Sequence, residues 1–256
     1  MIVLELLWWT GWAWFVAWAA LPLLFVPALG PMVGIVVWAL LAPWCALLGM
    51  ALLHRALPAS ESGTFRLFAD RGSTCWALKG WAPSVFLTVF QPLFFLSPPF
   101  QRLALRAFQA RLGKGAWITS RTIVREPHHV RIGRGSLVGE YAHLVCSYQP
   151  RIGLLIVGRI DIGENVLIGA YSLIAAGTRV GDGAILEHNV SVGAGTVIGE
   201  RVRIGAGSCL YNRVQVGVGA ILGKNCVVSS GATIPPGSRI PDGTLVTGTM
   251  AEVNAA

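Results

Sequence analysis

The sequence predicts a solenoid of short parallel strands behind an apolar helical region that is long enough to cross a membrane. The first observation is a six-residue repeat that runs from Ile132 to Val246. The second is a stretch of 48 residues without a charged side chain, from Leu6 to Leu53. The third is the formal net charge of +8. Many of the basic residues that contribute to it follow this apolar stretch closely.

The repeat places an aliphatic residue at every sixth position. Nineteen of its twenty first positions are Ile, Leu or Val, and Pro150 is the exception. From Ile162 on, a small or medium residue follows four positions later, and Gly often follows the aliphatic residue directly. A fixed short period means that each unit stacks on its neighbours and that together they bury one continuous core. A period of six fits a short strand followed by a tight corner, and it fits neither an amphipathic helix nor a long strand.

This pattern resembles the hexapeptide-repeat family over roughly residues 112–250. The resemblance implies a left-handed parallel β-helix with three hexads per triangular coil, about six to seven coils and a length of ~30 Å. It also implies an acyltransferase that works as a homotrimer. Residues 251–256 are expected to form a C-terminal tail.

Residues 1–111 are predicted to form a membrane region. A span needs about 20 apolar residues, so two spans fit within 6–53, with a break at Gly30–Pro31. Five of the ten Trp residues lie between Trp8 and Trp18, as in the aromatic belt at a membrane surface. A buried helical hairpin in the core of a soluble domain is the alternative.

The distribution of basic residues predicts the orientation. Between Arg55 and Lys114 there are eight Lys or Arg residues and two acidic residues, Glu61 and Asp70. Positive flanks stay in the cytoplasm, so the chain is predicted to be a multi-pass protein of a bacterial-type inner membrane with a cytoplasmic β-helix. The positive charge would attract anionic membrane lipid. Because it forms no compact patch, we do not expect nucleic-acid binding.

Two further segments precede the repeat. Residues 81–98 are apolar but contain Pro83, Gln91 and Pro92, which favours an interfacial or re-entrant segment over a straight span. Residues 100–111 are predicted to form a basic amphipathic helix. It could lie on the membrane surface, cap the open end of the β-helix, or do both.

His188 is the first candidate catalytic residue. It follows Glu187 on an outward corner, and a coil of eighteen residues places Ala170 and Ala206 on either side of it. In the lipid A pathway acyltransferases of this fold, the catalytic His occupies a similar hexad position and is followed by Asp or Asn, and the string ILEHNVSVG is similar to theirs. The resemblance implies that His188 is a general base; a solvated surface His is the alternative. Asn189, Asn212, Glu187 and Tyr171 are the candidate substrate-binding residues.

His143 is the second candidate. Sugar acetyltransferases of this fold carry a His on a loop before a run like Ile162–Gly169, and the preceding stretch here, CSYQPRIGLLIVG, has none. His143 is the nearest candidate, and a packed or solvated His is the alternative. The coil spacing takes His143 to Asp161, so no His cluster lies on neighbouring coils and no metal is expected. His128 and His129 fall where the repeat slips by two residues, so we expect a loop there. The five scattered Cys residues are expected to be reduced thiols.

The C-terminal segment bears on the acyl donor. The run from Ile240 to Val253 looks like the closing segment of acetyl-CoA-dependent members, which implies cofactor contacts near Gly248. Lys224 and Arg239 are candidate phosphate contacts, and Glu252 stands where those members have Lys. The donor is therefore expected to be acyl-CoA or an acyl carrier protein.

The order of membrane spans, amphipathic helix and β-helix also resembles the membrane C-terminal regions of nonribosomal peptide synthetases that make amino-acid polymers. That resemblance implies aminoacyl transfer from a carrier protein. The main expectation is a membrane-anchored acyltransferase that moves an acyl group from a thioester to a hydroxyl or amine. A non-catalytic trimeric membrane scaffold is the rival from another class.

Overall fold

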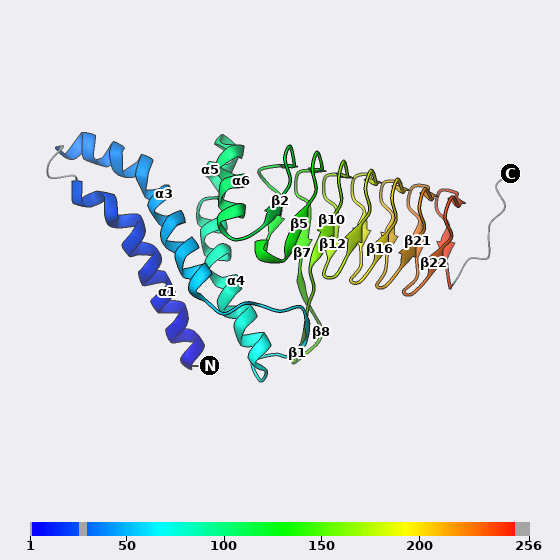
Figure 1. Cartoon of the computed structure of the whole chain (residues 1–256), viewed down its shortest axis with the longest axis horizontal. Coiled ribbons are helices and arrows are strands. Elements are labelled where there is room, and N and C mark those ends of the chain that lie inside the picture. The colour runs from blue at the N-terminus through cyan, green and yellow to red at the C-terminus, as the bar shows by residue number, and fades with distance from the viewer. Residues whose placement is uncertain (1, 26–29, 249–256) are drawn as a thin grey trace.

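The computed structural model describes residues 2–25 and 30–248, in which a bundle of helices abuts one end of a β-helix (Figure 1). The expected tail, 251–256, and Glu252 lie outside the described residues. The helical end begins with α1 (Ile2–Ala20), η1 (Leu21–Phe25) and α3 (Pro31–Ala56). The break between α1 and α3 falls where Gly30–Pro31 predicts it: Gly30 has φ 78°, and the fixed ring of Pro31 starts the next helix.

Three more helices connect this pair to the β-helix. They are α4 (Arg71–Val89), α5 (Gln91–Leu96) and α6 (Pro98–Ala107). The expected segment 81–98 is therefore divided between the end of α4, which contains Pro83, and α5. Phe86 of α4 is fully buried and lies in one apolar cluster with Met50 of α3 and Phe100 of α6. This part of the segment packs against protein.

The amphipathic helix α6 caps the open end of the β-helix. Phe100, Ala104 and Leu105 on its apolar face are buried, and Leu105 belongs to the core cluster of the β-helix. The Gln101 side chain donates from Nε2 to the carbonyl of Thr119 in the first coil, at 3.2 Å. Of the two roles that the sequence leaves open for this helix, these contacts correspond to capping, and its buried apolar residues are covered by protein.

The repeats form three parallel seven-stranded sheets, which make the three faces of a triangular solenoid. The first face contains β2 (Arg111–Leu112), β5 (Val130–Ile132), β10 (Ile160–Ile162), β13 (Arg179–Val180), β16 (Val197–Ile198), β19 (Gln215–Val216) and β22 (Thr233–Ile234). The second contains β3 (Trp117–Ile118), β6 (Leu137–Val138), β11 (Leu167–Ile168), β14 (Ile185–Leu186), β17 (Arg203–Ile204), β20 (Ile221–Leu222) and β23 (Arg239–Ile240). The third contains β4 (Ile123–Val124), β7 (His143–Val145), β12 (Leu173–Ala175), β15 (Ser191–Val192), β18 (Cys209–Leu210), β21 (Val227–Val228) and β24 (Leu245–Val246).

The aliphatic repeat positions fill the interior of this solenoid. Leu186, Ile204 and Leu222 stack in one buried column of the second face, while the residue before each of them points outward. Gly is required where successive corners touch: a Cβ on Gly205 would lie 2.5 Å from the backbone carbon of Gly223. The core is therefore continuous along the axis, as the six-residue period predicts.

Two of the twenty predicted hexads are wrong, those that begin at Pro150 and Ile156. Residues 147–157 leave the solenoid as a hairpin of β8 (Ser147–Arg151) and β9 (Leu154–Val157), which extends below the coils in Figure 1. β9 pairs antiparallel with β1 (Gly63–Arg66), so the backbone N–H and C=O groups on the outer edge of this hairpin have hydrogen-bond partners. As a result Ile162 stacks on Ile132, and His143 stacks on Leu173 rather than on Asp161 as the uninterrupted period predicted.

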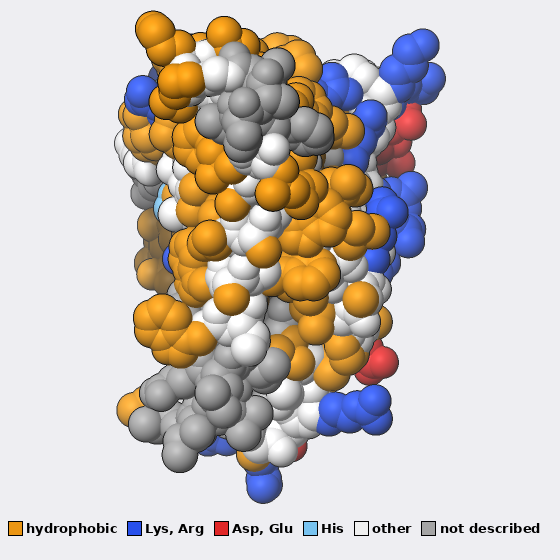
Figure 2. Space-filling model, turned by 90° about the vertical axis from the view of Figure 1, so that its left-hand side faces the viewer, with side chains coloured by type: hydrophobic (Ala, Val, Ile, Leu, Met, Phe, Trp, Pro, Cys, Tyr) orange, Lys and Arg blue, Asp and Glu red, His pale blue; other side chains and the backbone are white. Residues whose placement is uncertain are grey.

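The apolar surface lies at the helical end. Within the described residues, α3 is the helix long and apolar enough to cross a membrane, and a shorter apolar helical segment covers Trp12–Leu24. Exposed apolar side chains of α3 include Met32, Ile35 and Leu40. Figure 2 shows hydrophobic side chains spread over this end of the molecule, with basic side chains mainly along one edge.

Candidate active site

His188 lies on the corner between the second and third faces, which we call the His188 corner (residues 187–190 and their equivalents in the other coils). The backbone fixes its neighbours: Asn189 N–H donates to the Ala170 carbonyl, and Gly207 N–H donates to the His188 carbonyl. Ala170 and Ala206 therefore flank His188 in adjacent coils, as the eighteen-residue spacing predicts. Their methyl groups leave the exposed imidazole accessible from both sides.

Glu187 helps to hold this corner together. Its Oε2 accepts a hydrogen bond from the Ala206 amide at 3.0 Å, across the gap to the next coil. By contrast, no described residue accepts a hydrogen bond from the backbone N–H of Ala170 or of His188. Beside the imidazole there are thus two unpaired amide donors, which are the kind of group that can stabilise an oxyanion.

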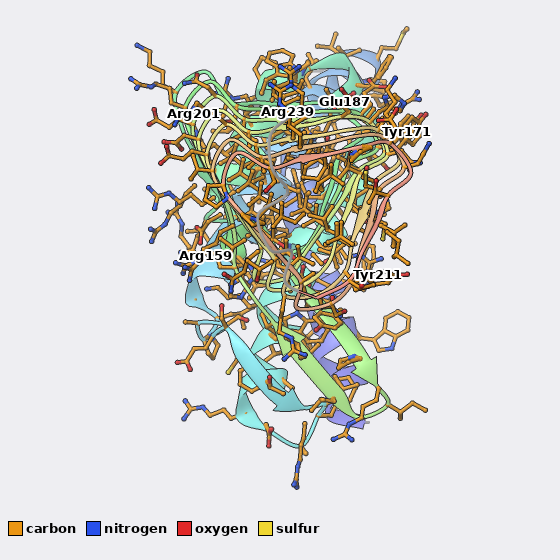
Figure 3. The ribbon with its side chains drawn as sticks, turned by 90° about the vertical axis from the view of Figure 1, so that its right-hand side faces the viewer. Arg159, Tyr171, Glu187, Arg201, Tyr211 and Arg239 are labelled. Atoms are coloured by element: carbon orange, nitrogen blue, oxygen red, sulfur yellow. The ribbon has the colours of Figure 1, made fainter. Side chains whose placement is uncertain are left out.

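Aromatic residues continue the His188 corner toward the helices. Tyr171 and Tyr141, one and two coils away, stack with ring centroids 5.0 Å apart and nearly parallel planes. The Arg121 guanidinium of the first coil lies 5.3 Å from the Tyr141 centroid and 5.4 Å from that of Phe95 on α5. This column connects the surroundings of His188 to the helical end, and Figure 3 shows Tyr171 and Glu187 at the same corner.

Basic residues lie on the other side of His188. Lys224 occupies the same corner position two coils further on, and Arg203 and Arg239 point outward from β17 and β23 of the adjoining second face. All three are exposed. Arg203 therefore joins the predicted pair Lys224 and Arg239. The sequence signal for Arg203 is its position directly before the aliphatic residue Ile204, where side chains point outward.

The structure does not bring every predicted residue to this corner. Asn189 follows His188 and adopts φ 57°, with its side chain exposed. Asn212 lies on the corner between the third and first faces, where its Oδ1 accepts from the Ala194 amide at 2.9 Å. Gly248 follows β24 on that same other corner, with φ 73°. Asn212 and Gly248 are therefore on a different edge of the prism from His188.

His143 is not at a corner. It is exposed on β7 in the third face, between Ile123 and Leu173 of the neighbouring strands. It precedes the hairpin but is flanked by two aliphatic side chains. The geometry offers His143 fewer polar groups than it offers His188.

A buried polar cluster lies at the helix–solenoid junction, where the sequence predicts only a loop. The His128 ring lies 5.1 Å from that of His54 and 4.6 Å from that of His129, measured between centroids. Lys79 Nζ donates to the His54 carbonyl at 2.7 Å, and His129 Nε2 lies 3.0 Å from Ser60 Oγ. The two-residue slip in the repeat, where η2 (Pro127–His129) replaces the expected loop, is the only sequence signal for this cluster.

Burial controls the charge of this cluster. It lowers the pKa of His128 to about 2, with further contributions from repulsion between its protonated form and the charged forms of His129, His54 and Lys79. Burial likewise lowers the pKa of His129 to about 4, with a further contribution from Arg159. Both imidazoles are therefore neutral at physiological pH. Among the described residues, no group of three or more His, Cys, Asp or Glu side chains is arranged to hold a metal ion.

The comparisons with known proteins agree with the solenoid. Residues 159–194 and 177–212 match the family "Bacterial transferase hexapeptide (six repeats)", and residues 195–235 match "Hexapeptide repeat of succinyl-transferase". Both family models describe hexapeptide repeats of transferases, and together they match residues 159–235. Because the second family is named for succinyl transfer, the matches support an acyltransferase. No curated protein matches the chain.

Several solved structures are similar to this chain over about half of its length, at low identity. LpxA from Acinetobacter baumannii is 20% identical, with a TM-score of 0.48, over 54% of this chain and 56% of its own. AntD from Bacillus cereus, an N-acyltransferase solved with dTDP and 3-hydroxybutyryl-CoA, is 17% identical, with a TM-score of 0.43, over 53% and 80%. The chain spans only about half the length of the LpxA structure.

Proposed function

We propose that the protein is a membrane-anchored acyltransferase with His188 as general base. The observation that carries the proposal is the His188 corner itself: an exposed imidazole lies between two Ala residues, next to the unpaired amides of Ala170 and His188. Imidazole is the side chain best suited to accept a proton near neutral pH.

The reaction requires few groups. His188 removes the proton from an acceptor hydroxyl or amine as the acceptor's lone pair attacks the thioester carbonyl. The unpaired amide of Ala170 stabilises the resulting oxyanion. The tetrahedral intermediate then collapses, the carbon–sulfur bond breaks, and the thiolate takes the proton back from the imidazolium. Glu187, which bonds to the Ala206 amide, positions the corner, and Asn189 and Tyr171 contact the acceptor.

The donor is acyl-CoA or an acyl carrier protein. Lys224, Arg203 and Arg239 are exposed on the side of His188 that faces away from the helices, where they suit phosphate groups. Asn212 and Gly248, on another edge of the prism, could reach the donor only across a subunit interface. Aminoacyl transfer from a carrier protein uses the same base and amides, so it is retained as the alternative chemistry.

The anchor is a two-span hairpin of α1 with η1 and α3. Eight basic residues follow it, which favours a β-helix on the cytoplasmic side of a bacterial-type inner membrane, next to anionic lipid. Outward apolar residues in the first three coils of the second face, Trp117, Leu137 and Leu167, form a column suited to homotrimer contacts, and Arg203 and Arg239 lie in later coils of the same face. A scaffold without catalysis would use the same column.

Acyl transfer by the purified full chain tests this proposal. Labelled acyl-CoA is incubated with a lipid and metabolite extract, and transfer to any acceptor is counted for wild type, His188→Ala and His143→Ala. We expect His188→Ala to lower turnover by ~10²–10⁴ and His143→Ala to change it little. Full activity in His188→Ala would overturn the assignment, and no transfer by any form would favour the scaffold.

A further inference from the structure

An apolar pocket of about 530 Å³ lies between α1, α3 and α4, away from the His188 corner. Its walls include Trp14, Leu53, Leu57, Phe68, Trp76 and Trp81. The size is typical of sites for small organic ligands. Leu53 and Leu57 flank the point where α3 ends its apolar run and reaches Arg55, so the pocket lies at the level of the proposed membrane surface.

One carboxyl group lines this apolar pocket. Glu126 is only 4% exposed, and its Oε1 accepts hydrogen bonds from Ser147 Oγ at 2.6 Å and from Trp76 Nε1 at 3.2 Å. Its Oε2 is buried and no described donor meets it at full hydrogen-bonding geometry, although the nearby Cys146 backbone N–H lowers the pKa of the carboxyl, against the larger rise that burial causes. Because this oxygen is enclosed in the unliganded protein, a ligand donor reaches it only when the Glu126 side chain turns toward the pocket, and the gain of a hydrogen-bond partner favours that turn.

We propose that the pocket binds a single-chain amphiphile whose head group, preferably a primary ammonium, donates a hydrogen bond to Glu126. The tail contacts the aromatic and aliphatic walls, and the head supplies the donor that Oε2 lacks. Burial raises the pKa of Glu126, and a ligand ammonium would restore the charged form. This site is independent of the acyl-transfer chemistry, because it uses no residue of the His188 corner.

The competing ligand is an anionic amphiphile. Arg125 also lines the pocket and could attract a carboxylate head group. However, the Arg125 side chain is exposed, so solvent and salt screen its charge, whereas the Glu126 carboxyl is buried. The buried group should therefore decide which head group is preferred.

Photo-crosslinking to the full chain in nanodiscs tests the proposal. The probes are a long-chain primary amine, the matching alcohol and the matching fatty acid, each with a diazirine in the tail, and labelled residues are mapped by peptide mass spectrometry. We expect labelling of the pocket walls to be about tenfold stronger with the amine than with the fatty acid, as expected for one charge-assisted hydrogen bond. The alcohol should fall between them.

Two variants and a control sharpen the result. In Glu126→Gln the amide oxygen can still accept from Ser147 and Trp76, while the amide nitrogen turns the unpaired position into a donor. Labelling by the amine should then fall about tenfold and labelling by the fatty acid should rise. Gly80→Leu should abolish labelling by all three probes, because a Cβ there has open space, with Glu126 Cγ at 4.0 Å, and a longer side chain would fill the pocket. The exposed control Glu200→Gln should match wild type.

The proposal fails if the fatty acid labels wild type as strongly as the amine, or if Glu126→Gln leaves the preference unchanged. Should Glu126→Gln not fold, Gly80→Leu decides the matter alone. Undiminished labelling in that variant would show that the probes bind elsewhere.

Discussion

The solenoid and the helix–solenoid junction handle polar residues in opposite ways. In the solenoid, aliphatic residues and small hydroxyl residues that bond to the backbone, such as Thr178 and Ser208, are buried, and the ionisable side chains of the His188 corner lie outside. At the junction, Glu126, His128 and His129 are enclosed between segments that are distant in sequence. A repeat must keep its interior uniform so that coils stack, so chemistry is left to its outer corners. A junction has no such restriction and can bury ionisable side chains.

The comparison is tested most strongly by deleting side-chain volume in each region. Leu186 is fully buried in the solenoid, so Leu186→Ala should lower the free energy of unfolding by about 3 kcal/mol. Leu48 of α3 is 55% exposed, so Leu48→Ala should cost far less in detergent. Denaturation followed by circular dichroism measures both. Equal losses would mean that the solenoid core is not the main source of stability.

Acid should destabilise the junction rather than the solenoid. Because the folded-state pKa values of His128 and His129, about 2 and about 4, are below 6.5, the unfolded chain binds more protons in acid. The stability they contribute is complete above pH 6.5 and declines below it, by roughly 1 kcal/mol per pH unit for each histidine. Glu126 has the opposite effect. Because its folded-state pKa is raised, its contribution to the free energy of unfolding decreases as the pH rises above the ordinary pKa of a glutamate.

Melting temperatures between pH 7 and pH 5 measure this dependence. The double variant His128→Asn/His129→Asn should show a shallower slope than wild type, whereas His188→Asn should not change it. If the double variant keeps the wild-type slope, the buried histidines are not the source of the acid sensitivity.

Replacing a glycine by alanine should have opposite effects on stability in the solenoid and in the helical region, because the space beside the two backbones differs. At Gly205 an added Cβ would meet the backbone of Gly223 at 2.5 Å, so Gly205→Ala should cost about 1–3 kcal/mol. At Gly80 in α4 the nearest atom is 4.0 Å away, so Gly80→Ala should stabilise the protein by about 0.5–1 kcal/mol. Thermal melts of the two variants should shift in opposite directions. Shifts in the same direction would contradict the close stacking of the corners.

The smallest effect is expected on the outside of the solenoid. Tyr171 is 63% exposed and stacks on Tyr141, so Tyr171→Ala should change stability by less than about 1 kcal/mol. If Tyr171 contacts the acceptor, the same change should raise KM several-fold and leave kcat nearly unchanged. An unchanged KM would remove Tyr171 from the site.

The sequence was sufficient wherever the repeat is uninterrupted. The six-residue period predicts the strands from β10 to β24, and the eighteen-residue coil places Ala170 and Ala206 beside His188. The same spacing shows that Asn212 and His188 lie on different corners. Asn212 follows His188 by 24 residues, which is one coil of eighteen residues plus one face of six.

The interruptions could not be predicted in the same way. Pro150 and Ile156 keep the period by coincidence, and only the pairing of β9 with β1, far away in sequence, shows that they leave the solenoid. The histidine cluster likewise depends on how α3 and α4 pack against the first coils. Such contacts between distant segments have no local signal, so the buried groups at the junction emerge only from the three-dimensional structure.

The most direct measurement for the central claim, that acyl transfer takes place at the His188 corner, is a cryo-EM structure of the full chain with a non-hydrolysable acyl-CoA analogue. The account predicts that the carbonyl of the analogue lies beside the His188 imidazole and the Ala170 amide, with its phosphates toward Lys224. An acyl group bound at another corner of the solenoid, or in the pocket beside Glu126, would contradict it.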